Sequence, residues 1–212
     1  MVELGRHAPF TFSGALTGIV IMLIVLFGNL LPRISPLSQD IFYILHPTHV
    51  VLSAIVTTAM YMRYKRARIW LAILIGYTGS VGIATLSDSI VPYVGEVLLD
   101  LPNRGVHLGF VERWWLVNPA ALLGILIGYR KWLTKFPHYG HVLISTWASL
   151  FHVIMALGGM IGWLDILAIL LFLFLAVWFP CCLSDIIYPL VFVREPSHLP
   201  LEKGSLAPRQ GS

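Results

Sequence analysis

Charged residues are scarce in this chain. Only 11% of its 212 residues are Asp, Glu, Lys or Arg, whereas 58% are hydrophobic. A soluble domain has about 25% charged and about 45–50% apolar residues, so this chain has too little charge to cover a surface that faces water. The composition excludes an ordinary soluble domain and predicts an all-α fold, a polytopic membrane helix bundle.

Cysteine is nearly absent as well. The two cysteines, Cys181 and Cys182, are adjacent in the sequence, which makes them poor partners for each other in a disulfide of ordinary geometry. A small extracellular domain held together by disulfides is therefore excluded. We expect both thiols to be reduced, near the cytoplasmic end of the last span.

Long uncharged runs take the place of charge. A helix needs about 20 apolar residues, within a range of about 17–25, to cross a bilayer. We expect six spans, at residues 10–31, 41–62, 69–87, 114–129, 141–161 and 163–184. The fourth run is short, so to cross the bilayer the helix must extend into its flanking residues or lie where the membrane is thinner. Asp88 ends the third run, and Asp185 ends the sixth.

The few basic residues are distributed unevenly between the loops. Eleven of the 14 Lys and Arg residues fall before the first span, after the sixth, or in the loops after the second and fourth. The positive-inside rule then places both termini in the cytoplasm, and the expected location is a prokaryotic plasma membrane. The loops account for the net charge of +4, so no nucleic-acid partner is predicted. The expected partner is the lipid bilayer, with assembly into a homo-oligomer left open, and residues 196–212 are expected to form a disordered cytoplasmic tail.

A polar pattern occurs twice. The stretches HPTHVVLSA and HYGHVLIST each begin with two histidines three residues apart. Steps of three and four residues continue in both copies, which keeps their members on one helix face. The members are His46, His49, Ser53, Thr57 and Met60 in the first copy, and His138, His141, Ser145, Ser149 and His152 in the second.

A second motif recurs in the same order. LSDSIVPY begins at Leu86, and LSDIIYPL begins at Leu183. The two matches predict a single membrane domain built from two repeats of three helices, at residues 10–99 and 114–193. Because three is an odd number, the second repeat enters the membrane from the opposite side, as in many transporters.

The aspartate motif has its own local interpretation. Ser and Asp are good helix caps, and proline is tolerated in the first turn of a helix. We therefore expect each motif to mark a helix that breaks and restarts near a membrane surface, Asp88 toward the outside and Asp185 toward the cytoplasm. The same topology places the first histidine pair at the outer face and the second pair at the inner face.

Histidine and carboxylate together suit a divalent transition metal such as Zn, Fe or Mn. The residues expected to form an outer cluster are His46, His49, Asp88 and His152, and those expected to form an inner cluster are His138, His141 and Asp185, with Cys181 one turn before Asp185. The alternative is that the histidines lie at the headgroup level and bond water or backbone. Cys181 is equally consistent with a small buried hydrophobic residue.

The hydroxyl residues of the two stripes predict a path for a substrate through the membrane. They are Ser53, Thr57, Ser145 and Ser149. The competing interpretation is that these hydroxyls bond their own backbone or a neighbouring helix.

Two functions from different classes agree with these patterns. The first is a transporter or channel for a small cation, either a divalent metal or proton-coupled, because paired sites near opposite faces suit alternating access. The alternative is a membrane-embedded, metal-dependent enzyme acting at the outer face, which the acidic loop at residues 95–113 favours. Haem is a weaker interpretation, because the expected topology puts His46 and His141 at opposite faces.

Overall fold

The computed structural model describes residues 2–64, 69–130, 135–183 and 188–192. Within these ranges the chain is helical and contains no strand, which confirms the all-α expectation. The elements are α1 (Val2–Phe27), α2 (Leu31–Tyr64), α3 (Ile69–Thr85), the π-helix η1 (Leu86–Ile90), α4 (Val91–Leu98), α5 (Gly109–Glu112), α6 (Trp114–Arg130), α7 (Lys135–Ala156), α8 (Trp163–Cys182) and α9 (Tyr188–Val191).

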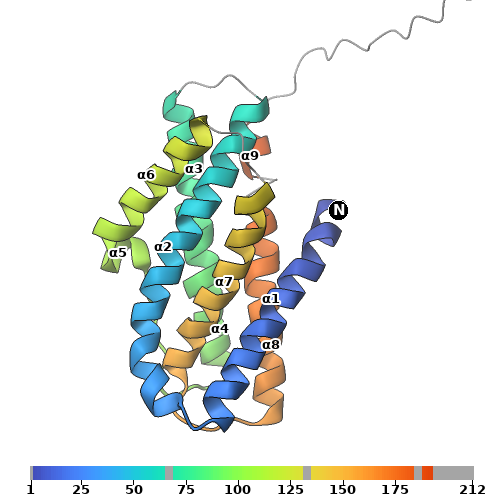
Figure 1. The fold of residues 1–212 in the computed structure, drawn as a ribbon, viewed down its shortest axis with the longest axis vertical. Helices are drawn as coiled ribbons and strands as arrows, with labels where there is room; N and C mark the ends of the chain where they lie inside the picture. The colour runs from blue at the N-terminus through green and yellow to red at the C-terminus, as the bar shows by residue number, and fades with distance from the viewer. Residues whose placement is uncertain (1, 65–68, 131–134, 184–187, 193–212) are drawn as a thin grey trace, which may run out of the picture.

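Helices α2 and α7 form the centre of the bundle (Figure 1). They lie side by side and run in opposite directions, with α1 and α8 on one side and α6 on the other. Helices α3 and α4 follow one another on a single course behind them, and run in the same direction as α7. Two long faces of α2 are thus covered by protein, which makes its middle the most enclosed part of the fold.

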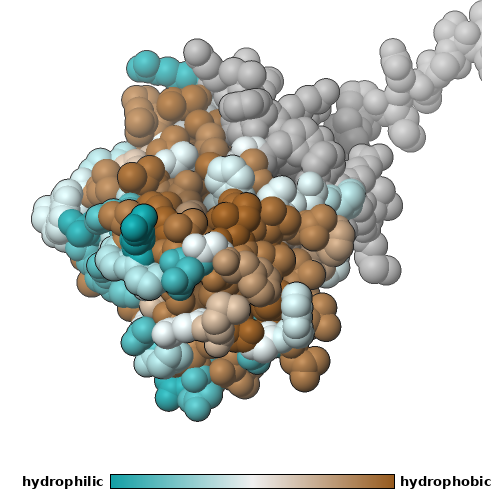
Figure 2. Space-filling model, turned by 60° about the horizontal axis from the view of Figure 1, so that its bottom comes forward, coloured by the Kyte–Doolittle hydropathy of each residue, from teal (hydrophilic) through white to brown (hydrophobic). Residues whose placement is uncertain are grey.

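The outside of the bundle is apolar. Along α1 the side chains of one face are between 48% and 60% exposed, and they are Phe12, Leu16, Val20, Ile24 and Phe27. Figure 2, which brings the lower end of Figure 1 forward, shows hydrophilic residues gathered at that end beside broad hydrophobic areas. A soluble monomer rarely exposes so large an apolar area, so this surface suits lipid.

Three helices are long and apolar enough to cross a membrane. They are Leu31–Met62, Ile69–Leu98 and Trp163–Cys181. Two shorter apolar helices, Thr11–Phe27 and Gly140–Ala156, accompany them within the described ranges. These helices indicate that the protein associates with a membrane.

The ends of α1 and α2 differ from the expected spans. Helix α1 ends at Phe27, and Asn29 adopts a positive φ of 52° in the turn that follows. Asparagine is one of the few residues that tolerates this left-handed conformation after a helix. Helix α2 then begins at Leu31, well before the expected start at residue 41. His46 therefore lies far inside α2, rather than at its end.

The expected helix break at the first LSDxIxxP motif is wrong. Thr85 and Val91 both have helical φ and ψ angles, and the backbone N–H of Val91 donates to the carbonyl of Leu86, five residues earlier. The helix thus continues through one wider, π-type turn. Pro92, which follows, has no N–H to give to a carbonyl four residues back, so a local departure from the regular α pattern is favoured here. Of the second copy, residues 184–187, which include its aspartate, lie outside the described ranges.

Glycines allow α6 to approach α2 closely, as the G-x-x-x-G spacing predicts. A Cβ atom at Gly124 would lie 2.5 Å from the carbonyl oxygen of Val51, and one at Gly128 would lie 2.6 Å from the carbonyl oxygen of Ile55. Such distances are far below ordinary contact, so no other residue fits at either position without moving backbone. The contact holds α6 against the half of α2 that follows its histidines.

Candidate functional site

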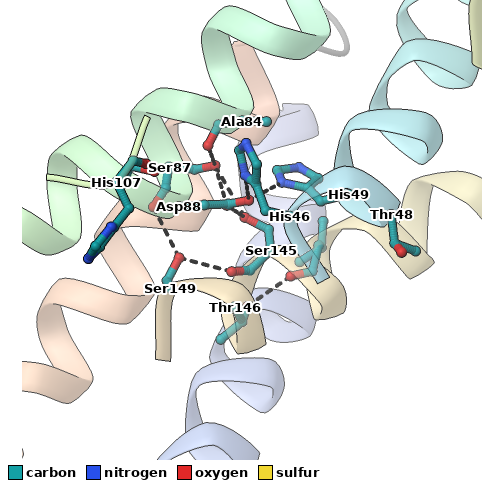
Figure 3. A network of polar contacts seen from close by, with 12 residues as sticks. His46, Thr48, His49, Ala84, Ser87, Asp88, His107, Ser145, Thr146 and Ser149 are labelled. Atoms are coloured by element: carbon teal, nitrogen blue, oxygen red, sulfur yellow. Dashed lines mark hydrogen bonds and ion pairs between the residues drawn. The ribbon is translucent and has the colours of Figure 1, made fainter. Parts of the chain in front are cut away.

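Asp88, in the π turn, is the centre of a buried polar network. Its Oδ2 lies 2.9 Å from Nδ1 of His46 and 2.8 Å from Nδ1 of His49 (Figure 3). All three side chains are at most 1% exposed. The spacing of three residues in α2 places both imidazoles on the face that meets the π turn. One carboxylate oxygen therefore fixes the orientation of two rings.

Serines bind the other oxygen of the same carboxylate. Ser145 from α7 and the adjacent Ser87 each donate to Oδ1 of Asp88 at 2.7 Å. Ser149 donates to the carbonyl oxygens of Ser87, at 3.0 Å, and Ser145, at 2.9 Å. Asp88 thus accepts from groups on three helical segments, which offsets the cost of burying a carboxylate.

His141 lies beside His49. Their rings stack with centroids 5.7 Å apart and an angle of 6° between their planes. The donor atoms of His49, His141 and Cys181 all lie within 4.8 Å of one another, and the three residues are buried. Two imidazoles and a thiol at this spacing can hold one transition-metal ion. We call this candidate metal site the metal centre.

The bond between His49 and Asp88 matches what a metal ligand requires. A histidine that binds a metal almost always gives its other ring N–H to a carboxylate, a backbone carbonyl or water, which fixes its tautomer. Nδ1 of His49 is engaged with Asp88, so Nε2 is the nitrogen left for a metal. Asp88 acts here as an orienting partner of a ligand.

A second buried polar pair lies on the other side of the network. Nδ1 of His152 lies 2.7 Å from Oε1 of Glu96, and both side chains are 1% exposed. Glu96 comes from α4, and its Oε2 also accepts from the backbone N–H of Gly105 at 3.3 Å. The ring of Phe42 separates this pair from the Asp88 network, since it stacks on His46 at 5.2 Å and meets His152 at 5.5 Å, measured between centroids.

The loop before α5 connects the His152–Glu96 pair to the exposed surface. The rings of His107 and His152 have centroids 5.3 Å apart, and His107 Nδ1 lies 3.4 Å from Oε2 of Glu112.

Burial raises the pKa of the Glu112 carboxyl, but hydrogen bonds from Tyr43, the Leu108 backbone N–H and His107 outweigh it, so this pKa lies below its ordinary value. Glu112 is thus held as a carboxylate at neutral pH.

The predicted site residues are therefore brought together in a different combination. His46, His49 and Asp88 meet as expected, but Asp88 is fully buried instead of lying near a surface. The expected separation of the two histidine pairs to opposite faces is wrong for His141, which stacks on His49. His152, expected to join the outer cluster as a fourth member, binds Glu96 instead. Asp185 and the side chain of His138 lie outside what the structure describes.

The expected path residues are all buried. Ser145 and Ser149 join the Asp88 network, and Ser53 and Thr57 are at most 1% exposed on α2. Sequence reasoning gave too little weight to Cys181 and placed Glu96 in an external loop. The signal for Cys181 was its position one turn before the second aspartate. Glu96 had only the weaker signal of a charged residue within an apolar run.

Gly109, the first residue of α5, closes over His46. A Cβ atom there would lie 2.6 Å from Cδ2 and 2.8 Å from Nε2 of the imidazole. The ring cannot move aside, because Asp88 and Phe42 hold it. We expect Gly109→Ala to lower the free energy of unfolding by about 1–3 kcal/mol, the usual cost of overpacking.

Thermal unfolding of the purified protein in detergent measures this effect, with Gly82→Ala as the matched control. A Cβ atom at Gly82 meets nothing within 4 Å, so that variant should be as stable as the parent or slightly more so. Equal stability of the two variants would show that Gly109 does not press against His46.

No family model matches this chain, and neither a curated protein nor a solved structure is significantly similar to it. Function is therefore inferred from the residues and their geometry.

Proposed function

We propose that the protein transports a transition-metal cation through the membrane and holds it midway at the metal centre. The observation that carries the proposal is the buried set of His49, His141 and Cys181, with Asp88 fixing the tautomer of His49. Ionisable side chains are costly at membrane depth and usually belong to substrate or ion pathways. The donor set includes a thiol, which favours Zn²⁺ or a softer ion over Mg²⁺ or Ca²⁺.

Burial and the course of the polar stripe support transport of an ion. The three donor residues are at most 3% exposed, which suits a dehydrated ion better than a molecular substrate. Polar side chains continue along α2 and α7 on both sides of the centre, with Ser53 and Thr57 toward one end and His152 toward the other. An ion that leaves the centre would thus meet polar groups in both directions.

The finer membrane topology belongs to the same proposal. Six spans in two inverted repeats would place α2 and α7 as equivalent helices, which agrees with their opposite directions at the centre of the bundle. Both termini would then lie in the cytoplasm. The two histidine stripes would form one central site, instead of two gates.

A metal-dependent enzyme is the second candidate. It is favoured by the segment around α5, which brings His107 and Glu112 to one end of the polar interior and packs Gly109 on His46. A substrate bound at that end would approach the centre from one side. Retention of a metal without any flux would favour this candidate over transport.

Metal content and flux test the proposal together. The purified protein should contain about one Zn²⁺ or similar ion per chain. Alanine at His49, His141 or Cys181 should lower metal affinity at least about tenfold, since each change removes a ligand. In liposomes with a metal-sensitive dye in the lumen, the same variants should lose metal uptake.

Thr48→Ala is the matched control for these variants. Thr48 precedes His49 but is exposed on the opposite face of α2, so its loss should leave metal content and uptake unchanged. Undiminished metal content in all three ligand variants would show that these three residues do not bind the metal. If the parent protein binds metal but does not carry it into liposomes, the proposal of transport is wrong.

A further inference from the structure

The His152–Glu96 pair lies outside the metal centre. Among the described residues, the donor atoms grouped for a metal are those of His49, His141 and Cys181. His152 and Glu96 bond each other instead, at 2.7 Å, and both are 1% exposed. A proton can pass directly between an imidazole nitrogen and a carboxylate oxygen at this distance.

One nitrogen of His152 is left open. Its Nδ1 faces Glu96, whereas its Nε2 is buried and has no hydrogen-bond partner among the described atoms. Leaving a buried polar atom without a partner costs free energy, so such atoms in a native fold usually have a function. An unpartnered imidazole nitrogen is a place where a proton can arrive.

The ring of His107 links the His152–Glu96 pair to the surface. The ring of His107, whose side chain is 26% exposed, meets the ring of His152, with centroids 5.3 Å apart. His107 in turn neighbours the Glu112 carboxylate, which also accepts a hydrogen bond from Tyr43. Groups that exchange protons with water thus lie one ring away from the buried pair.

Aromatic rings cover the pair on two sides, and the backbone N–H of Gly105 donates to Glu96. Helix α4 contributes Glu96, and the loop before α5 contributes His107 as the titratable group that meets His152. On the α2 side Phe42 lies between His152 and His46, and on the α8 side Phe172 packs on Gly95. A proton that reaches the pair is held there until Phe42 or a neighbouring group moves.

We propose that Glu96 and His152 form a proton-binding station, through which protons pass between the surface at His107 and the interior of the bundle. The proposal deepens the proposed function, on which its coupling of protons to metal movement rests. A proton station beside a cation site would allow a metal ion and protons to move in exchange.

The transfer conserves every proton. In the starting state Glu96 is a carboxylate and His152 is neutral, with its proton on Nδ1. A proton from the His107 side binds to Nε2 of His152, and the Nδ1 proton passes to Oε1 of Glu96. The products are a neutral carboxylic acid and a neutral imidazole of the other tautomer. When Phe42 moves, Glu96 releases its proton toward the interior and His152 returns to its first tautomer, which restores the starting state. No group is oxidised or reduced.

Glu96→Gln in the full-length protein is the test, because glutamine keeps the size of the side chain but cannot take up the proton. In liposomes with a pH-sensitive dye, a potassium gradient with valinomycin drives protons inward, and the measurement is repeated with Zn²⁺ outside. We expect the variant to lose at least about tenfold in proton flux under both conditions, while its metal content stays at the parent value. Asp100→Asn, on an exposed carboxylate paired with Arg104, is the control and should change neither quantity.

His152→Gln is the second variant and should show the same loss of proton flux. Parent-like proton flux in either folded variant would overturn the proposal. So would loss of metal content and proton flux together in both, since this shows a purely structural pair. Glu96-dependent proton flux in a protein that does not move Zn²⁺ would reject metal transport and leave the proton station standing. Zn²⁺ uptake by the parent protein without proton flux would reject the proton station and leave metal transport standing.

Discussion

Asparagine in place of Asp88 should weaken metal binding strongly and leave the helix bundle folded. The carboxylate accepts from Nδ1 of His46 and of His49 through a single oxygen, Oδ2. Ser87 and Ser145 donate to Oδ1 and keep the asparagine oxygen on their side, so its NH₂ group faces the histidines. That group can only donate, so both histidines must turn their Nδ1 into an acceptor. Their protons then lie on Nε2, where His49 needs a free lone pair to bind a metal. We expect metal affinity to fall about 10–100-fold.

Metal content after dialysis, measured by elemental analysis, gives the affinity change for Asp88→Asn, and thermal unfolding gives the stability change. Asp165→Asn is the matched control, because Asp165 accepts a hydrogen bond from the backbone N–H of Gly162 at the start of α8, a role that asparagine can fill. Full metal content in Asp88→Asn would show that the carboxylate does not set the tautomer of His49.

Valine in place of Gly124 should prevent α6 from packing on α2. A Cβ atom at this position would meet the carbonyl oxygen of Val51 at 2.5 Å and the Cβ of Ala54 at 2.7 Å. The carbonyl oxygen is a backbone atom and the Cβ is bonded directly to the backbone, so neither can rotate away. We expect a loss of about 3 kcal/mol in the free energy of unfolding, at the upper end of the cost of overpacking.

Size-exclusion chromatography and thermal unfolding in detergent measure this loss. Leu123→Val on the same helix is the control, since Leu123 is 52% exposed and the change only shortens a side chain on the outer face. A Gly124→Val protein as stable as the control would mean that α6 does not contact α2 at this point.

The grouping of His46, His49 and Asp88 could be predicted from the sequence, because each follows from a local rule. Histidines three residues apart share a helix face, and a carboxylate on the next helix is their natural partner. The close approach of α6 to α2 likewise follows from glycines four residues apart. These features depend on spacing within one helix or between neighbours in the chain.

The meeting of His49 with His141 could not be predicted in this way. Spans were delimited by charged residues, so Asp40 placed the start of the second span just before His46. In the structure α2 begins at Leu31, and the helix includes Asp40. Both histidines of α2 are therefore much deeper in the bundle than a count from residue 41 suggests, which brings His49 to the level of His141.

The same rule misplaced Asp88. A charge within an apolar run predicts the end of a span, yet the helix continues to Leu98 as a single course of α3, η1 and α4. Two imidazoles and two hydroxyls contact the carboxylate and make its burial tolerable. A hydropathy profile registers the charge of Asp88, but it contains no information on the partners that other helices supply.

The π turn also sets the angle between the two polar stations. Asp88 and Glu96 are eight residues apart, and at about 100° per residue a regular α-helix would point them about 80° away from each other. Their partners on α7, Ser145 and His152, are seven residues apart and point within about 20° of each other. With spacings of eight and seven residues, two regular helices that run in the same direction could not form both the Asp88–Ser145 contact and the Glu96–His152 contact.

The wide turn at Leu86–Ile90 accommodates the one extra residue. Beyond it Glu96 occupies the angular position of a residue seven places after Asp88, so both carboxylates face α7. One backbone turn thus points the Asp88 network and the His152–Glu96 pair toward the same neighbouring helix.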